Sequence, residues 1–370
     1  MSRPLRVLQV VTKMDRGGLE TFIMNMYRTV NRDLVQFDFL CHRNGKHDYD
    51  DEIEHLGGRI YYVSRANPLS LNYWYELNKF FDIHSYKVVH SHIDCMSAEP
   101  LAAAARNGVK VRIAHSHNSR QDKDLKYPLK MACKPFIKKY ATDLFACGEE
   151  AGRWMFETDN FAVIKNAIDV SQYAFDRNLR LATREMLGIK PNSHVIGHVG
   201  RFQPVKNHEY IVRVFYALLK RDPNAILLLV GQGETLESTR KLVENLGIDS
   251  SVRFLGVRSD VSNLMMAMDV FIMPSLYEGL PLVLVEAQSS GLPCVISDTI
   301  PVDCDIDKRL IQRLPLSDSV DRWAARLCES VSAELDRSSG ATAVRNAGFD
   351  VVDQAARLQA FYLEKAGESE

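Results

Sequence analysis

Short runs of apolar, often β-branched residues alternate with longer amphipathic stretches along the chain. Residues 5–11 have the composition of a strand, residues 17–30 carry apolar positions at helical spacing, and residues 35–41 return to a strand pattern. Repeated β-α-β units of this kind form parallel sheets. The pattern therefore predicts an α/β fold.

The units fall into two series, separated by a connector at 163–175. Because 370 residues are too many for one compact core, we expect two Rossmann-like domains, residues 1–168 and 169–347. An amphipathic helix in 348–370 is expected to cross back onto the first domain. Ligands of open α/β sheets bind beyond the carboxyl ends of the strands, which predicts a site in a cleft between the domains. Further strand-like runs lie at 87–92, 111–117, 143–148, 194–201, 225–231, 252–256, 269–275 and 294–297.

Composition narrows the possible functions. The 46 Lys and Arg residues balance the 47 Asp and Glu residues, so the chain lacks the overall positive charge that nucleic-acid binding favours. No apolar stretch approaches the roughly 20 residues that span a bilayer, and the N-terminus lacks a signal-peptide pattern, so we expect a cytoplasmic protein. The seven cysteines show no metal-finger spacing and are expected to be reduced.

Two acidic residues flank an apolar run in "PSLYEGLPLVLVEAQSSGLP", residues 274–293. Pro281 suits the first position of a helix, which predicts a helix start near Leu280 with N–H groups that attract phosphate. Glu278 and Glu286 are eight residues apart, about 80° beyond two helical turns. Both carboxylates could therefore face one ligand. The alternative is two unrelated surface acids.

Two cations follow the first strand of the second series in "GRFQPVKNH", residues 200–208. Arg201 can hold phosphate oxygens in a planar fork, and Lys206 can act as a mobile point charge, so the pair could neutralise a leaving diphosphate. The alternative is two solvated loop cations. Gly17 and Gly18 would similarly let backbone approach a ligand after the first strand. The chain has no GxGxxG, so a nicotinamide or flavin site is unsupported.

The motifs "GRFQPVKNH", "LLLVGQGE", "VRFLG" and "MPSLYEGLPLVLVEAQSSGLPCVIS", in this order, closely resemble the retaining glycosyltransferases of family 4, which have the GT-B fold. The hallmark of that family, two glutamates separated by seven residues, is met by Glu278 and Glu286. The resemblance extends over essentially the whole chain, through "GGLETF", "HSH" and "VIKNAIDV".

The resemblance implies transfer of a sugar from a nucleotide diphosphate sugar to a hydroxyl, with retained configuration, without a cofactor and without an obligatory metal. Arg201 and Lys206 would bind the diphosphate and stabilise the leaving group. Glu286 would accept hydrogen bonds from the ribose, and Glu278 would contact the donor sugar. The other substrate-contacting positions that it implies are Gly17 and Gly18 near the phosphates and acceptor, Gly256 and Val257 at the nucleobase, and Gly279, Leu280 and Pro281 beside the sugar.

Histidines occur in two "HSH" triplets at predicted strand ends. The family places one histidine against the transferred sugar, and the two candidates are His115 and His117. We prefer His117, because it would lie at the loop, whereas His115 would point into the sheet as a core residue. His92, near Asp94, is expected toward the acceptor. We expect the triplets to alternate between faces of the sheet and therefore to form no metal site. The Asp-x-Asp sequences at 122–124 and 303–305 are expected to be surface charge.

A lysine row, Lys126, Lys130, Lys134 and Lys138, has helical spacing, although two prolines interrupt it. It is either a solvated helix face or a contact with anionic lipid at the inner face of the plasma membrane. The resemblance implies a lipid-linked or growing glycan as acceptor, in exopolysaccharide or capsule synthesis, with a UDP-sugar favoured as donor. The alternatives are a non-hydrolysing sugar-nucleotide epimerase and an inactive partner subunit that binds the nucleotide sugar.

Overall fold

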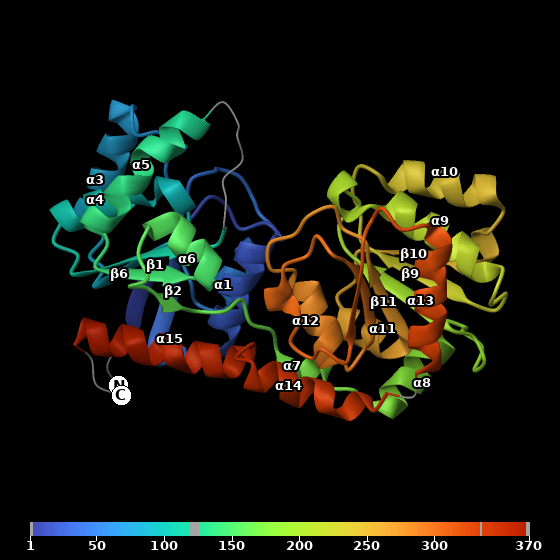
Figure 1. Ribbon diagram of the computed structural model, residues 1–370. Helices are drawn as coiled ribbons and strands as arrows, with labels where there is room; N and C mark the ends of the chain where they lie inside the picture. The colour runs from blue at the N-terminus through green and yellow to red at the C-terminus, as the bar shows by residue number, and fades with distance from the viewer. Residues whose placement is uncertain (1–2, 119–125, 334, 368–370) are drawn as a thin grey trace. The chain divides into compact units, whose positions relative to one another are not determined.

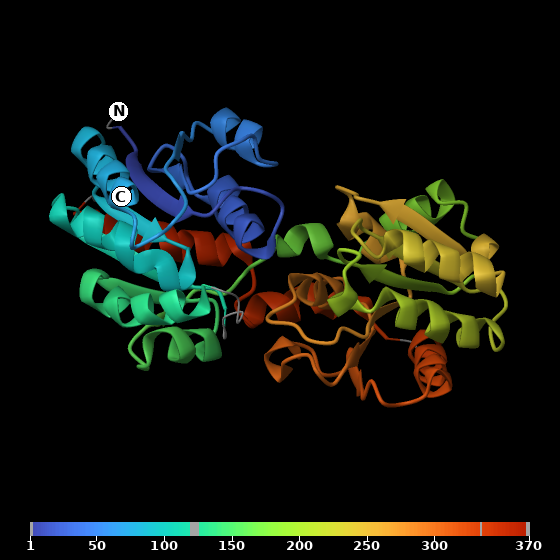
Figure 2. The ribbon, with the colours of Figure 1, turned by 90° about the horizontal axis from the view of Figure 1, so that it is seen from above.

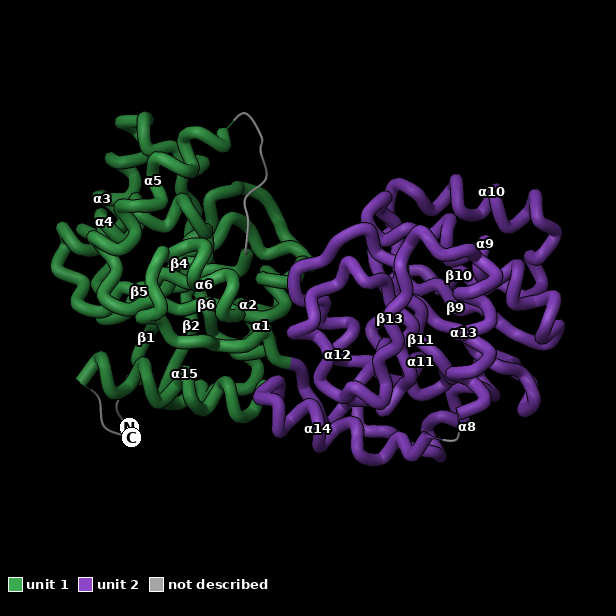
Figure 3. Tube along the Cα trace, viewed as in Figure 1, with its two compact units in different colours: residues 1–167, 351–370 green, residues 168–350 purple. Residues whose placement is uncertain are grey.

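A computed structural model of the chain describes residues 3–118, 126–333 and 335–367. Contacts divide the chain into two compact units (Figure 3). Unit 1 contains residues 1–167 and 351–370, and unit 2 contains residues 168–350. Each unit is built around its own parallel sheet, which confirms the predicted pair of Rossmann-like folds.

The sheet of unit 1 has seven parallel strands in the order β3-β2-β1-β4-β5-β6-β7. Most of these strands are buried on both faces, as parallel strands covered by helices are. The strands are β1 (Leu5–Val11), β2 (Val35–Cys41), β3 (Ile60–Tyr62), β4 (Val88–Ser91), β5 (Val111–Ser116), β6 (Asp143–Ala146) and β7 (Ala162–Val163).

Helices cover both faces of this sheet, and each face has its own core cluster. One face carries α1 (Gly18–Thr29), α2 (Asp50–His55) and α15 (Val351–Ala366); the other carries α3 (Leu71–Ile83), α4 (Ala98–Arg106), α5 (Tyr127–Tyr140) and α6 (Glu149–Phe156). α15 is the red helix that runs along unit 1 in Figure 1 and in Figure 2. Its buried residues belong to the same core cluster as those of α1. The predicted return of the C-terminal helix to the first domain is therefore confirmed.

The sheet of unit 2 has six parallel strands in the order β10-β9-β8-β11-β12-β13. They are β8 (Val195–Val199), β9 (Ile226–Val230), β10 (Val252–Gly256), β11 (Val270–Met273), β12 (Cys294–Ser297) and β13 (Ile311–Leu314). Its faces are covered by α9 (His208–Leu219), α10 (Leu236–Leu246) and α13 (Val320–Ser332) on one side, and by α7 (Val170–Tyr173), α8 (Arg177–Met186), α11 (Val261–Ala267), α12 (Leu282–Ser289) and α14 (Gly340–Asn346) on the other.

Some local expectations differ from the structure. The sequence pattern did not reveal β3, β7 or β13, which are short. α12 begins at Leu282, and Pro281 is its N-cap residue, so the helix starts two residues later than expected. Asp303 is exposed as expected, but Asp305 pairs with the Arg313 guanidinium at 2.6 Å and is largely buried. The sequence 122–124 lies outside the described residues.

The lysine row on α5 is not one solvated face. Lys134 is buried, its ammonium donates to Glu157 at 2.7 Å, and it lies 5.0 Å from the centre of the Trp154 ring. Lys130 is partly buried, whereas Lys126 and Lys138 are exposed. The spacing thus places part of the row against α6. Among the described residues, no helix combines the length and apolar character that crossing a bilayer requires.

Candidate active site

The chain order of the strands defines a crevice in each unit. In unit 2 the order reverses between β8 and β11, and in unit 1 it reverses between β1 and β4. Connections leave such a pair of strands in opposite directions, so the loops beyond their carboxyl ends diverge and leave room for a ligand. Of the residues singled out from the sequence, Gly17 follows β1, His92 follows β4, Lys206 follows β8 and Glu278 follows β11.

In unit 2 the loops beyond β8 and β11 are joined by an ion pair. The Lys206 ammonium, at the end of a short 3-10 turn, donates to Glu278 Oε1 at 2.6 Å. Both side chains are mostly buried, with 17% and 12% of their surfaces exposed. The pair therefore sits at the crevice with a cation on one wall and a carboxylate on the other.

Backbone contacts hold these loops in place. Asn207 has a left-handed backbone, φ 58°, and its side-chain amide donates to the Pro274 carbonyl at 3.2 Å. The Leu276 N–H donates to the Val205 carbonyl at 2.8 Å. Asparagine tolerates the left-handed region better than most residues. Lys206 is thus carried on a turn whose shape depends on the neighbouring residue.

Glycines bring the loop after β9 against the loop after β8. Gly231 has φ 138°, and a Cβ there would lie 2.1 Å from the Gly200 carbonyl oxygen. Gly233 has φ 154°, and a Cβ there would lie 2.3 Å from the Phe202 carbonyl oxygen. Side chains at either position would push the chain away. The conformation of the "VGQGE" segment therefore fixes the loop that carries Arg201.

The remaining candidates of unit 2 surround this pair. Arg201 is exposed beyond β8, and Gly256 ends β10 with φ 66°. Val257 and Tyr277 each expose 55% of their surfaces, although both are large and apolar or aromatic. A Cβ at Gly279 would meet no atom within 4 Å. Beside the buried ion pair, this edge of the sheet thus has accessible backbone at Gly279 and two exposed side chains, Val257 and Tyr277. Leu280 is partly buried, and Pro281 is buried at the helix start.

Glu286 lies in α12, and its environment differs from that of the ion pair. Burial raises its pKa to about 7, which a hydrogen bond with Tyr173 opposes. Burial, followed by the charge of Glu286, raises the pKa of Tyr173. Near neutral pH, Glu286 therefore exchanges its proton easily and can accept hydrogen bonds from hydroxyl groups as the carboxylate.

In unit 1, Gly17 is the N-cap residue of α1 and Gly18 is the first residue of the helix. A Cβ at Gly18 would have no neighbour within 4 Å, and Gly18 is exposed. At Gly17 the Glu20 side chain lies close, because a Cβ there would come within 2.3 Å of Glu20 Oε2. The start of α1 thus has open space beside Gly18 and the Glu20 carboxylate beside Gly17.

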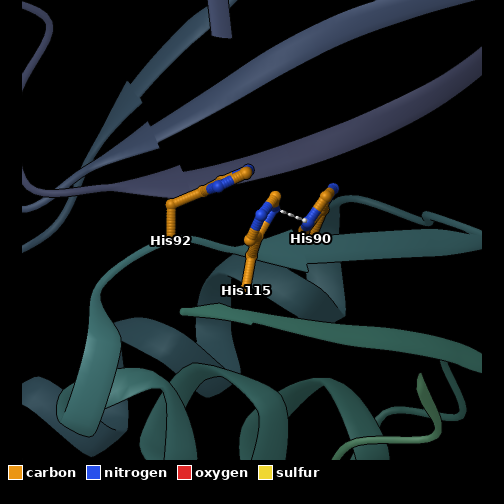
Figure 4. A group of neighbouring side chains, drawn as sticks. All are labelled: His90, His92 and His115. Carbon is orange, nitrogen blue, oxygen red and sulfur yellow. Dashed lines mark hydrogen bonds between the residues drawn. The ribbon is translucent and has the colours of Figure 1, made fainter. Parts of the chain in front are cut away.

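Four histidines, from the carboxyl ends of β4 and β5 and the residues that follow them, lie close together in unit 1. Our expectation that the two triplets alternate faces is wrong, because His90 in β4 and His92 just beyond its end are two residues apart and lie on the same side, with ring centres 4.1 Å apart. β5 is the neighbouring strand, and the His115 and His117 rings stack with centres 4.1 Å apart. Figure 4 shows the rings of three of these residues, His90, His92 and His115, turned toward one another.

Nitrogen atoms of His90, His92 and His115 lie within 4.8 Å of one another, a spacing from which three neutral imidazoles could hold a metal ion. Both ring nitrogens of His90 and of His92 already have hydrogen-bond partners. Burial lowers the pKa of all three far below the usual value, so the rings are neutral. Hydrogen bonding between neutral rings therefore accounts for the cluster.

The contacts form two chains. Tyr362 of α15 contacts His90 Nδ1 at 2.6 Å, and His90 Nε2 contacts His115 Nδ1 at 3.2 Å. The second chain runs from Gln9 Oε1 through His92 to His117. Because the Gln9 oxygen accepts, His92 carries its proton on Nε2, and its Nδ1 accepts from His117 Nε2 at 2.9 Å.

His117 therefore has a lone pair on Nδ1, a buried atom with no hydrogen-bond partner. Burial lowers the pKa of His117 to about 3, which keeps the ring neutral. Asp94 accepts from the His117 N–H at 3.2 Å and from Asn118 Nδ2 at 2.7 Å, which holds the loop beyond β5. His115 itself is buried within β5, with 1% of its surface exposed.

The structure thus brings together Lys206 with Glu278, and His92 with His117 and Asp94, within their respective units. Sequence reasoning missed the residues that hold these groups: Asn207, Tyr173, Gln9 and Tyr362. An asparagine directly before a helical run was a signal for a turn at Asn207. The others are partners from distant segments, for which the sequence offers no pattern.

Known proteins share both the sequence and the fold. The model of Glycosyltransferase Family 4 matches residues 16–172, and that of Glycosyl transferases group 1 matches residues 180–314. A Bacillus subtilis protein called putative glycosyltransferase EpsF is 38% identical, over 89% of this chain and 88% of its own.

More distant relatives extend the comparison. An Escherichia coli UDP-Gal:alpha-D-GlcNAc-diphosphoundecaprenol alpha-1,3-galactosyltransferase is 26% identical over 78% of each chain. The crystal structure of Anabaena HepE in complex with UDP superimposes with a TM-score of 0.79 over 98% of this chain and all of that one, at 18% identity. The chain belongs to glycosyltransferase family 4 and has the GT-B fold.

Proposed function

We propose that this glycosyltransferase uses unit 2 to bind a nucleotide diphosphate sugar and transfers the sugar with retention of configuration. The observation that carries the proposal is the ion pair of Lys206 and Glu278 at the strand-order reversal of the second sheet. A crevice at such a reversal is where open α/β sheets bind nucleotides. A cation there can bind phosphate, and a carboxylate there can bind hydroxyl groups.

The ion pair itself suggests how the donor enters. A diphosphate carries more negative charge than Glu278, so its arrival draws the Lys206 ammonium toward the phosphates. Glu278 is then left to accept hydrogen bonds from hydroxyls of the donor sugar. Arg201, on the same loop, adds a second cation. As the glycosidic bond breaks, negative charge grows on the diphosphate, and the two cations stabilise it.

Glu286 is proposed to accept from the ribose hydroxyls, and Gly256 and Val257 to border the nucleobase. In unit 1, Gly17 and Gly18 are proposed to lie near the phosphates and the acceptor, and His117 is proposed to contact the transferred sugar. The unpartnered Nδ1 of His117 supports this, since it can accept a hydrogen bond from a hydroxyl group.

The names of the relatives support the choice of substrates. The E. coli galactosyltransferase uses UDP-Gal and a diphosphoundecaprenol-linked acceptor, and HepE binds UDP. We propose a UDP-sugar as donor, and a lipid-linked or growing glycan in surface polysaccharide synthesis as acceptor. Electrostatic stabilisation by Arg201 and Lys206 would replace an obligatory metal ion. An enzyme with this acceptor works at the cytoplasmic face of the membrane.

The test is a screen of UDP- and GDP-sugars that measures nucleotide diphosphate release with and without a lipid-linked acceptor. One donor should release its nucleotide faster with acceptor, in the presence of EDTA, and Lys206→Ala should slow this release by about 100-fold or more. NMR of the product should show the donor's anomeric configuration. Interconversion of the donor sugar without an acceptor would instead identify an epimerase, and binding without turnover would identify an inactive subunit.

A further inference from the structure

The outward face of α3 is unusually apolar. Leu71, Tyr75 and Ile83 expose 86%, 63% and 64% of their surfaces, and Lys79 completes a row spaced by four residues. Leu69, just before the helix, exposes 80%. In the described part of the chain, Leu71 and Leu69 are the most exposed large hydrophobic residues. Residues four apart advance by about 40° around a helix, so the row winds over about 120° of the surface of α3 and forms a strip about 18 Å long that Lys79 interrupts.

This face is not needed for the core of unit 1. The opposite face of α3 already supplies four buried side chains, those of Tyr73, Leu77, Phe80 and Phe81. A surface helix normally turns polar residues to solvent. An exposed strip of leucine, tyrosine and isoleucine is typical of a surface that binds a partner.

A basic hollow adjoins the C-terminal end of the strip. It has a volume of about 330 Å³, and Ile83 forms part of its wall. Arg3, Arg6, Arg59 and Lys87 also line it. Its one acidic lining residue, Asp38, is buried and already accepts from the Arg6 guanidinium and from the Tyr86 hydroxyl at 2.9 Å. The hollow therefore has an excess of positive charge and suits a phosphate group.

The topology of the sheet determines where the strip and the hollow lie. α3 connects the carboxyl end of β3 to the amino end of β4. Leu69 and Leu71 thus lie toward the edge of the sheet at which β1 and β4 end, and Ile83 lies toward the opposite edge with the hollow. A surface bound along α3 would reach from the basic hollow to the crevice edge of unit 1.

We propose that the outer face of α3, together with the basic hollow, docks on an anionic phospholipid surface. The strip would enter the boundary of the acyl chains, with Tyr75 at the headgroup level and the Lys79 ammonium reaching back to it. The hollow would take a lipid phosphate. This rests on the proposed lipid-linked acceptor, and it specifies how the enzyme would meet it.

Charge favours lipid over a protein partner. Around the strip, the exposed ionisable residues are mainly cations, and the acids on α3 are the exposed Asp82 and the partly buried Glu76. The exposed cations on α3 and the segments beside it are Arg65, Lys79, Lys87, Arg106 and Lys110. Each basic residue near an anionic bilayer strengthens binding about fivefold. α5, with Lys134 buried, is not the docking face.

The experiment is co-sedimentation of the full chain with vesicles, in the absence of any substrate. Vesicles of phosphatidylcholine with phosphatidylglycerol should bind the wild type, and Leu69→Ser with Leu71→Ser should weaken binding by about tenfold or more. A matched control, Leu181→Ser with Met186→Ser, changes two residues of α8 in unit 2 that are 57% and 61% exposed. The control should bind like the wild type.

The second double variant, Arg59→Ala with Lys87→Ala, should bind the anionic vesicles at least tenfold more weakly than the wild type does. Its binding to pure phosphatidylcholine vesicles should equal that of the wild type. Inorganic phosphate at the ionic strength of a chloride control should not displace the protein, since the docking site includes the strip. Equal binding by all variants overturns the proposal. So does a change from dimer to monomer in Leu69→Ser with Leu71→Ser without any vesicle binding, which would assign the strip to a second copy.

Because binding is measured without donor or acceptor, failure here leaves the proposed transfer untouched. Conversely, a chain that binds vesicles as described but releases no nucleotide would contradict the proposed function alone.

Discussion

The crevices of the two units share a topology and differ in chemistry. Both sheets reverse their strand order after the first strand, between β1 and β4 and between β8 and β11. Unit 2 places an ion pair there, Lys206 with Glu278. Unit 1 places neutral imidazoles there, because burial depresses the pKa of His92 and His117. The two sheets thus have the same strand-order reversal, and a few loop residues determine the charge of each crevice.

The difference matches the tasks proposed for the two halves. A diphosphate leaving group needs fixed positive charge, which the loop after β8 supplies. An acceptor hydroxyl needs directed hydrogen bonds, and cations beside it would compete for the phosphates. The four predictions that follow separate these contributions, starting with the largest.

Lys206→Ala should lower kcat/KM by about 100- to 1000-fold, because it removes the charge proposed to stabilise the departing diphosphate. Nucleotide diphosphate release measures the effect. The control is Lys190→Ala, an exposed cation before β8 in the same unit, which should leave kcat/KM unchanged. Comparable losses in both variants would mean that general charge, and not the crevice, supports transfer.

Glu286→Gln should remove a pH dependence of stability. Since the folded protein raises the pKa of Glu286 from 4.5 to about 7, the unfolded chain loses this proton first as pH rises. Stability contributed by the protonated side chain is full below pH 4.5 and is lost as pH rises through 7. Relative to wild type, the variant should gain on the order of 3 kcal/mol of unfolding free energy across this range.

Chemical denaturation at a series of pH values measures this difference. The same difference at every pH would show that Glu286 ionises freely in the folded protein.

His117→Ala should lower kcat/KM by about 10- to 100-fold, the loss of a directed hydrogen bond to substrate. Calorimetry should find the affinity for UDP unchanged, because unit 2 is proposed to hold the nucleotide. A large drop in UDP affinity would mean that the crevice of unit 1 binds the nucleotide as well.

Tyr362→Phe should cost about 1–2 kcal/mol of unfolding free energy, since it leaves buried His90 Nδ1 without its partner on α15. Thermal unfolding measures the cost, and UDP affinity should stay at the wild-type value. Phe361→Leu, on the same helix, is a comparison that leaves the hydrogen bond in place. An unchanged stability in Tyr362→Phe would mean that this contact does not anchor the helix.

Periodicity was sufficient to predict the pair of parallel sheets, because long buried strands such as β1 and amphipathic helices such as α1 have strong local patterns. Spacing also placed Lys206 and Glu278 at loops beyond strands. It did not predict that they bond, because their distance depends on the backbone of Asn207 and on glycines from a third loop.

For the histidines, the sequence showed the residues but not their arrangement. The two triplets were visible, but period-two alternation was assigned wrongly, and the partners Gln9 and Tyr362 lie far away in the sequence. The lysine row on α5 also had the spacing of a surface, yet Lys134 is buried against Trp154. Packing between helices decides which face of a helix remains in solvent, and local pattern does not encode it.

The location of the diphosphate in a crystal structure with UDP tests the central claim most directly. The account predicts phosphate oxygens within hydrogen-bond distance of Lys206 and Arg201, with the bond from Lys206 to Glu278 broken. A diphosphate bound elsewhere, with that bond intact, would contradict it.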